Sequence, residues 1–443
     1  DGGSYAEKLS NRALALPLSN ESFRCSGAVG TGACTWYAES GTITRDSSAP
    51  LNDAVINAMW LEPGAVASNA GFPGGIAVAA GQSLVLSLFV YVKTGGSASI
   101  EARLVDGMSA SGATLGSAVI VAPAATGSKG PQWVKLNATL SVKTTSGSDG
   151  CRFQLKLLGN SNALVGVTVI SLFPEETWMG RENGLRADVA SWLNESQPAF
   201  LRAPGGCYVE GRALANRWNW KTTLGAIEDR PGHMNDVWGY WSDDGLGMYE
   251  YLQMAEDVGA KPLLVLNAGC PTGSKNKCVS GTAMQPYLQD TLDAVEYATG
   301  ASTTTWGSKR AAAGHPAPYE LTALGIGNEN CHGDNGYPQN WFAIATAVRA
   351  KYPKLPLILG CETQEQMEDV LKIEPRIATF ADLYVDVHQR KDPDEFLAAA
   401  HEFDTYPRTP HYPKPFVSEY SSPRKLYPNS TTLGAAVAEA IYM

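Results

Sequence analysis

Between residues 50 and 173, hydrophobic and polar residues alternate with a period of two. Apolar residues occupy every second position from Val134 to Val142, and the run from Arg152 to Leu157 repeats this alternation. Segments rich in Gly, Ser and Thr separate such runs. Strands with one apolar and one polar face pack sheet against sheet. The pattern therefore predicts an antiparallel β-sandwich over residues 50–173.

After Pro174 the pattern changes to helical segments that alternate with short apolar strands. Apolar residues at helical spacing between Leu185 and Leu193 precede a strand at Phe200–Leu201. Five further apolar strands are predicted at 262–267, 321–326, 355–359, 383–387 and 416–417, and helical segments precede all of them except 321–326. Six strands that alternate with helices predict a parallel sheet of the α/β class.

Short strands buried on both faces favour a (β/α)8 TIM-type barrel over residues 174–443, with residues 1–49 leading into it. A doubly wound sheet is the alternative fold. That fold would need a glycine-rich phosphate turn after an early strand, and Pro204-Gly205-Gly206 is not a GxGxxG sequence.

Composition excludes several classes of protein. A chain of 443 residues is long enough for more than one domain, and 44% hydrophobic residues supply a large core. The net charge of −10 opposes binding to nucleic acid or to anionic lipid. The longest apolar run, Leu84–Val92, has the length of a strand, so we expect no membrane insertion.

Several sequence features indicate a secreted glycoprotein. The N-terminal sequence from Asp1 has no apolar signal core, so we expect that any targeting segment has been removed. Glycosylation sequons occur at Asn20, Asn137, Asn194 and Asn429.

Cysteine spacing predicts disulfides rather than a metal site. The pairs Cys25/Cys34 and Cys270/Cys278 flank Gly/Ser/Thr-rich loops, which favours loop-closing disulfides. Cys331/Cys361 follow consecutive strands, where a disulfide and two free thiols are equally compatible with the sequence. Short CxxC or HxxxH spacing is absent from the sequence, so we expect no metal.

Polar residues cluster where the predicted strands end, which is where barrel enzymes carry their active sites. These positions are Arg202, Asn267, Asn328, Glu329, Glu362, His388 and Glu419. Glu329 and Glu419 directly follow apolar strands, and a pair of facing carboxyl groups suits glycoside cleavage. The alternative is that each glutamate only forms a salt bridge at the rim, for example with Arg202.

Other side chains have a structural and a functional interpretation. Cys207 follows the Gly-Gly turn and is expected to be a buried structural thiol rather than a nucleophile. His388 is expected to donate hydrogen bonds at the rim rather than bind metal. Four tryptophans could either stack on sugars or pack in the core. They are Trp218, Trp220, Trp238 and Trp241.

The chain resembles the glycoside hydrolase family 51 α-L-arabinofuranosidases of plants and fungi. The resemblance lies in residues 1–12 (DGGSYAEKLSNR), 178–186 (WMGRENGLR), 200–211 (FLRAPGGCYVEG), 220–257, 325–331 and 415–420. It implies that Glu329 is the acid/base and Glu419 the nucleophile. It also implies that Asn328 binds a sugar hydroxyl and that Arg202 orients the nucleophile. We expect His388 and Asn267 to complete the substrate-binding set, with no cofactor.

The sequence departs from this family at three positions. The family has Gly-Asn-Glu-Asp-Cys, whereas this chain has Asn330 after Glu329 and His332 after the cysteine. The family has His-x-Tyr where this chain has His388-Gln389-Arg390. These departures leave open whether the protein is active.

Comparison with the family also implies that barrel strands one and eight lie outside residues 1–443. We expect further segments of the same polypeptide to complete the barrel and to carry a C-terminal β-sandwich. Residues 50–173 resemble the carbohydrate-binding-type sandwich that plant-like members insert near the N-terminus.

The sequence therefore predicts a retaining exo-acting α-L-arabinofuranosidase that acts on arabinose-containing polysaccharide or glycoprotein of the cell wall. The alternative is a catalytically inactive carbohydrate-binding or structural wall glycoprotein derived from this fold.

Overall fold

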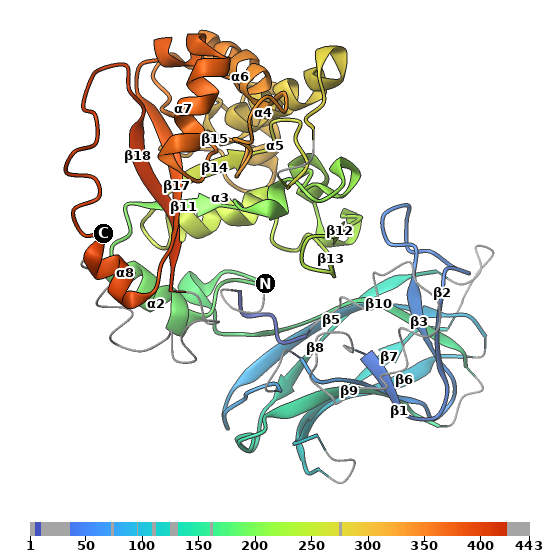
Figure 1. The fold of residues 1–443 in the computed structure, drawn as a ribbon. Coiled ribbons are helices and arrows are strands. Elements are labelled where there is room, and N and C mark those ends of the chain that lie inside the picture. Colours follow the sequence, from blue (N-terminus) through green and yellow to red (C-terminus); the bar gives the residue numbers. More distant parts are fainter. Residues whose placement is uncertain are drawn as a thin grey trace. The chain divides into compact units, whose positions relative to one another are not determined.

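The computed structural model describes residues 5–9, 36–71, 75–94, 96–108, 112–124, 132–159, 163–273 and 277–422. These residues form two compact units. The first comprises residues up to 198 together with 220–234 and 239–250, and the second comprises 199–219, 235–238 and the residues from 251 onward. Figure 1 shows the elements of both units.

The first unit is built from two five-stranded antiparallel sheets. One sheet has the order β1 (Trp36–Ser40), β4 (Val66–Asn69), β9 (Cys151–Leu157), β6 (Ala98–Asp106) and β7 (Thr114–Ala122). The other has the order β2 (Ile43–Asp46), β3 (Ala58–Leu61), β10 (Val165–Pro174), β5 (Ser83–Val92) and β8 (Val134–Ser141).

Side chains that alternate along these strands form one hydrophobic cluster. On β5, Leu84, Leu86 and Leu88 are fully buried, whereas the residues between them are more exposed. The same cluster contains Phe153 and Leu155 of β9, so both sheets contribute to it. The apolar residues that alternate in the sequence are therefore the ones on the buried faces of the sheets.

The β-strands begin earlier than the sequence pattern indicated. Strands β1 and β2 lie within residues 36–46, which we expected to lead into the barrel. They are separated along the chain by Gly41 and Thr42, and they pair with β4 and β3, respectively, in different sheets. Both strands are short and show no long alternation, which is why the sequence pattern did not reveal them.

The second unit contains a six-stranded sheet in which every strand is parallel to its neighbours. The order is β11 (Phe200–Ala203), β14 (Lys261–Leu266), β15 (Ala323–Ile326), β16 (Leu357–Leu359), β17 (Leu383–Arg390) and β18 (Lys414–Ser421). This order follows the chain, and the prediction of six parallel strands is confirmed.

Helices separate most of these strands along the chain. The α-helices are α2 (Ala187–Glu195), α3 (Met248–Asp257), α4 (Gln285–Thr299), α5 (Thr305–Ala312), α6 (Tyr337–Lys351), α7 (Gln364–Ile373) and α8 (Pro393–Ala398). Helix α6 contacts β15 and α7 contacts β17 (Figure 1). Shorter elements are η2 (Trp178–Gly180), η3 (Cys207–Val209), η4 (Leu214–Asn216), η5 (Trp220–Thr223), η6 (Ile227–Asp229), η7 (Gly281–Met284), η8 (Pro375–Thr379) and the pair β12 (His233–Asn235) and β13 (Tyr240–Ser242).

The parallel sheet curls so that its first and last strands approach each other. The ring of Phe200 on β11 lies 5.5 Å from the ring of Phe416 on β18, although the two strands are at opposite ends of the strand order. Phe416 packs against a cluster that includes Leu263, Val265 and Ile358. Because the sheet is curled, the carboxyl ends of its six strands surround a common space at one end of the sheet.

The expected disulfide Cys270–Cys278 is formed, and Cys331 and Cys361, for which the sequence left a disulfide and two free thiols open, are also bonded. Cys25 and Cys34 lie outside the described residues, as do the sequon residues Asn20 and Asn429. The other two sequon residues, Asn137 and Asn194, are exposed. Among the described residues, we find no helix whose length and apolarity would let it cross a membrane.

Candidate active site

A glycine turn positions the first cationic side chain of the site. Arg202 is the last residue but one of β11, and the turn at Gly205-Gly206 folds back over it with positive φ angles of 66°. A Cβ atom on Gly205 would lie 2.3 Å from Nη1 of Arg202. Only glycine allows the backbone to pass this close to the guanidinium, which explains the Pro-Gly-Gly sequence after the strand.

A strained turn after β15 presents Glu329. The turn begins at Gly327, where φ is +80° and an added Cβ would lie 2.3 Å from Oδ1 of Asn330. Glu329 itself has a φ of +51°, which is uncommon for a residue other than glycine. The phenol of Tyr337 braces the turn by donating to the carbonyl of Ile326 at 2.7 Å. A conformation of this kind is kept where the surrounding structure enforces it.

Strand β17 contributes three charged residues at alternating positions, and β18 contributes one. Asp386, His388 and Arg390 are two residues apart, so they lie on the same face of β17. Strand β18 lies beside β17 (Figure 1), and its Glu419 is paired with His388 after a register shift between Val387 and His388. This bulge places a glutamate beside the histidine.

The two predicted catalytic carboxylates lie close together in the described structure. One oxygen of Glu329, one oxygen of Glu419 and one ring nitrogen of His388 all lie within 4.8 Å of one another. Such a set could hold a metal ion, but two guanidinium groups already pair with Glu419. Arg202 contacts its Oε1 at 3.3 Å, and Arg390 contacts its Oε2 at 2.8 Å.

His388 and Glu329 form a tight ion pair. Nδ1 of His388 lies 2.7 Å from Oε1 of Glu329, and Nε2 lies 3.4 Å from Oδ2 of Asp386. Burial alone would lower the pKa of His388, but hydrogen bonds to Asp386 and Glu329 outweigh it and raise the pKa to about 9. The hydrogen bond from His388 lowers the pKa of Glu329, and Arg390 adds to this effect.

Two residues near Glu329 were not identified by the sequence as part of the site. The thiol of Cys207 lies 3.8 Å from Oε2 of Glu329 and is partly rather than fully buried, and its structural role stays a prediction. Burial raises the pKa of this thiol. Glu210 is fully buried, and its Oε1 accepts a hydrogen bond from the backbone N–H of Asn328 at 3.3 Å. Burial raises the pKa of Glu210 to about 8, so it is mainly protonated at neutral pH.

The structure brings together most of the predicted substrate-binding residues. Asn328 is fully buried, its Oδ1 accepts a hydrogen bond from Arg202 at 2.8 Å, and its Nδ2 has no hydrogen-bond partner among the described residues. Asn267 differs, because its side-chain amide makes four hydrogen bonds to backbone groups of nearby loops. Its binding role stays a prediction, since these contacts already explain the asparagine.

Asp386 was missed although a signal was available. It lies two residues before His388 on the same strand, so the period of two places both on one face. Its carboxylate accepts a hydrogen bond from Arg202 at 3.3 Å. The tryptophans divide as both interpretations allowed, because Trp218 and Trp220 are buried whereas Trp238 is 68% exposed.

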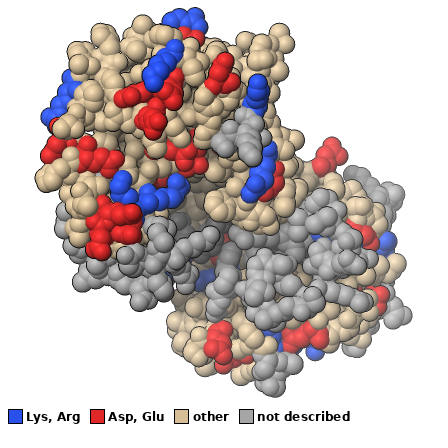
Figure 2. Space-filling model, in the orientation of Figure 1, with Lys and Arg blue, Asp and Glu red and all other residues tan. Residues whose placement is uncertain are grey.

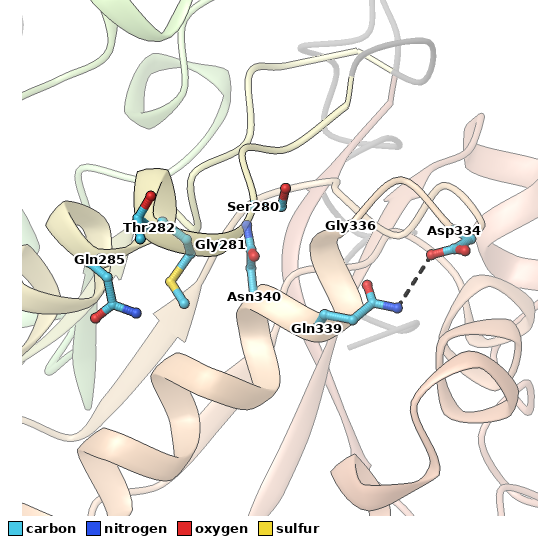
Figure 3. A pocket seen from close by; sticks show the side chains of 9 residues that line it. Ser280, Gly281, Thr282, Gln285, Asp334, Gly336, Gln339 and Asn340 are labelled. Atoms are coloured by element: carbon cyan, nitrogen blue, oxygen red, sulfur yellow. Dashed lines mark hydrogen bonds between the residues drawn. The ribbon is translucent and has the colours of Figure 1, made fainter.

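A separate pocket of about 630 Å³ lies at the start of α6 (Figure 3). It is lined by Ser280, Gly281, Thr282, Met284, Gln285, Asp334, Gly336, Gln339 and Asn340, and none of these is a predicted site residue.

On the face shown in Figure 2, acidic and basic side chains are interspersed over the described surface. The candidate site is therefore the charged cluster at the strand ends.

Known proteins similar to this chain are α-L-arabinofuranosidases. A family profile described as "Alpha-L-arabinofuranosidase 1 domain" matches residues 192–408. Alpha-L-arabinofuranosidase 1 of Arabidopsis thaliana is 34% identical, and the match covers 100% of this chain and 61% of the relative. An extracellular exo-alpha-L-arabinofuranosidase of Streptomyces chartreusis is 32% identical, over 98% of this chain and 51% of the relative.

A solved structure is also similar over the whole chain. The arabinose-bound MgGH51 α-L-arabinofuranosidase superimposes with a TM-score of 0.82 at 27% identity, covering 100% of this chain and 69% of that chain. The chain thus spans between half and two thirds of the length of the two relatives named above.

Proposed function

Because this chain belongs to glycoside hydrolase family 51, the α-L-arabinofuranosidases, we propose that it carries the catalytic site of a retaining exo-acting α-L-arabinofuranosidase. The observation that carries the proposal is the short distance between Glu329 and Glu419, whose nearest oxygens are within 4.8 Å. Carboxyl groups ~5–5.5 Å apart suit a double displacement, whereas inversion needs ~6.5–9.5 Å to admit a water molecule.

In this mechanism, Glu419 attacks the anomeric carbon and Glu329 protonates the departing oxygen. The bond between the sugar and the leaving group breaks as the ester to Glu419 forms. Glu329 then removes a proton from water, which attacks the same carbon and releases Glu419. Arg202 pairs with Oε1 of Glu419 and so orients the attacking carboxylate for the first step.

The low pKa of Glu329 calls for a proton source, and His388 can supply it. In the free site the proton resides on His388, 2.7 Å from the Glu329 oxygen. Transfer across this hydrogen bond gives neutral His388 and protonated Glu329, which is the form that can act as acid. Asp386 lies against the other ring nitrogen, Nε2, and so fixes the orientation of the imidazole.

The sugar itself would be held by groups around Arg202. The Nδ2 group of Asn328 is buried and donates to no described residue, so a furanose hydroxyl is a suitable acceptor for it. The guanidinium of Arg202 is held between the amide of Asn328 and the carboxylate of Asp386. These three groups therefore form a rigid surface against which a small sugar ring can bind.

The proposal is tested with Gln variants of both glutamates in the polypeptide that carries this chain. Glu419→Gln should abolish turnover of every arabinofuranoside, because no covalent intermediate can form. Glu329→Gln should lose ~10²–10⁴-fold on substrates whose leaving group needs protonation, and much less in the first step with an activated aryl arabinofuranoside. Added azide should then restore turnover. Glu365→Gln, at an exposed position on α7, is the control.

NMR of the first product should show the anomer with retained configuration. An inverted product would contradict the roles of the two glutamates. If the wild-type protein hydrolyses no arabinofuranoside, the inactive wall-protein alternative replaces the enzyme. If both variants keep full activity, the catalytic residues are misassigned.

We further propose that the substrates are arabinose-containing polysaccharide or glycoprotein and that the protein is secreted to the cell wall. The extracellular Streptomyces chartreusis relative supports secretion. Exposed sequons at Asn137 and Asn194 are consistent with a glycoprotein. Deglycosylation followed by intact mass measurement tests glycan occupancy.

The finer architecture is also a proposal. We propose that the six parallel strands belong to a (β/α)8 barrel and that the antiparallel sheets form an inserted carbohydrate-binding-type β-sandwich. The approach of Phe200 to Phe416 supports a curled sheet. Affinity electrophoresis with arabinan and arabinoxylan tests whether the antiparallel sheets bind polysaccharide.

A further inference from the structure

Arg390 lies at the carboxyl end of β17 and contacts both proposed catalytic carboxylates. Its Nη2 donates to Oε2 of Glu419 at 2.8 Å, and its Nη1 lies 3.5 Å from Oε1 of Glu329. The side chain is 49% exposed, whereas that of Arg202 is only 13% exposed. Arg390 is therefore the outer of two guanidinium groups on Glu419, and it can leave without unpacking the interior.

Each oxygen of Glu419 is occupied by a different arginine. Arg202 holds Oε1 and is itself fixed by Asn328 and Asp386. Arg390 holds Oε2 and also reaches the second carboxylate. The family resemblance implies a tyrosine at the position of Arg390. A phenol could donate one hydrogen bond, but it is neutral and cannot bridge two carboxylates with separate donors.

We propose that Arg390 is a positioning residue that holds Glu329 and Glu419 through one guanidinium and confines turnover to more acidic pH than a neutral residue would allow. This inference rests on the proposed function. It concerns a position at which the chain departs from its family.

The charges around Glu329 show why one cation matters. His388 and Arg390 face it from β17, Glu419 from β18, and Cys207 and Glu210 from the segment after β11. Glu210 is mainly neutral at pH 7, and so is the thiol.

With both catalytic carboxylates ionised, Arg202, Arg390 and protonated His388 balance the three acids Glu329, Glu419 and Asp386. Removing Arg390 leaves one uncompensated negative charge. Protonating Glu329 then becomes easier, because it relieves that charge.

Arg390 contacts whichever of the two carboxylates is negatively charged as the reaction proceeds. When Glu419 becomes an ester it loses its negative charge, and its hold on Arg390 weakens. Glu329 has by then given its proton to the leaving group and is ionised. Arg390 faces that carboxylate already, so it can stabilise the base form of Glu329 during hydrolysis of the intermediate.

The test compares four variants of the polypeptide that carries this chain. Arg390→Met and Arg390→Tyr remove the charge, Arg390→Lys keeps it, and Arg408→Met removes an exposed arginine elsewhere. The readout is the pH dependence of kcat/KM on an aryl arabinofuranoside whose leaving group needs protonation.

We expect the alkaline limb to move up by about one pH unit in Arg390→Met and Arg390→Tyr, since a half-exposed charge acts at the low end of the usual range. The limb should stay within a few tenths of a unit of wild type in Arg390→Lys and Arg408→Met. An unchanged limb in Arg390→Met would overturn the inference, as would an equal shift in Arg408→Met.

A second measurement does not depend on turnover. The protein is labelled at the glutamate carboxyl carbon and titrated by NMR, and Glu329→Gln assigns the signal of Glu329. The pKa of Glu329 should be higher in Arg390→Met than in wild type. No difference would overturn the inference about Arg390. A clear difference in a protein that hydrolyses no arabinofuranoside would support it and refute only the proposed function.

Discussion

Replacing Glu210 by glutamine should make the folded protein less sensitive to alkaline pH. Glu210 is fully buried, and burial raises its pKa from 4.5 to about 8. Below pH 4.5 the side chain is protonated in both the folded and the unfolded chain. Between pH 4.5 and 8 the unfolded chain releases this proton while the folded chain retains it, so the free energy of unfolding falls as pH rises.

The size of the effect follows from the pKa difference. One pH unit corresponds to 1.36 kcal/mol for one proton, so the loss by pH 8 is at most about 5 kcal/mol. Glutamine has nearly the same shape and cannot ionise, and its oxygen can still accept from the N–H of Asn328. Relative to wild type, Glu210→Gln should therefore gain stability progressively from pH 5 to 8.

The assay is urea unfolding of wild type, Glu210→Gln and the exposed control Glu365→Gln at pH 5, 6, 7 and 8. Comparing each variant with wild type at the same pH cancels the other titrating groups. A stability difference for Glu210→Gln that does not change with pH would show that Glu210 is ionised in the folded protein. The reasoning about its burial would then be refuted.

Two further predictions concern the loops and the sugar site. Chain entropy predicts a loss of about 3.6 kcal/mol when Cys331 and Cys361 are both replaced by alanine, and about 2.5 kcal/mol for Cys270 and Cys278, because the loops span 30 and 8 residues. Urea unfolding at one pH measures both, and the reverse order would contradict the loop-length argument. Asn328→Ala should lower kcat/KM on the order of 100-fold, because it removes a proposed hydroxyl donor and the contact that holds Arg202. Unchanged kinetics would exclude both roles.

Local periodicity determined the elements of this protein. The strand predicted at 262–267 is Lys261–Leu266, and the one at 383–387 lies within Leu383–Arg390. A buried strand must place apolar side chains at fixed intervals, so its own residues reveal it. Glu329, which follows β15, and Glu419, which lies within β18 just after its apolar residues, were identifiable for the same reason. An ionisable group next to an apolar run stands out without knowledge of its neighbours.

Which side chains meet was decided only by the tertiary structure. Arg202 contacts Asp386 across 184 residues of sequence, and Cys207 contacts Glu329 across 122. These contacts depend on the curl of the parallel sheet, and the pairing of Arg390 with Glu419 depends on the bulge between β17 and β18. Curvature and register result from packing summed over the whole sheet, and no single segment encodes them. For that reason the sequence identified the two acids and Arg202, whereas only the fold showed that Arg390 contacts both acids.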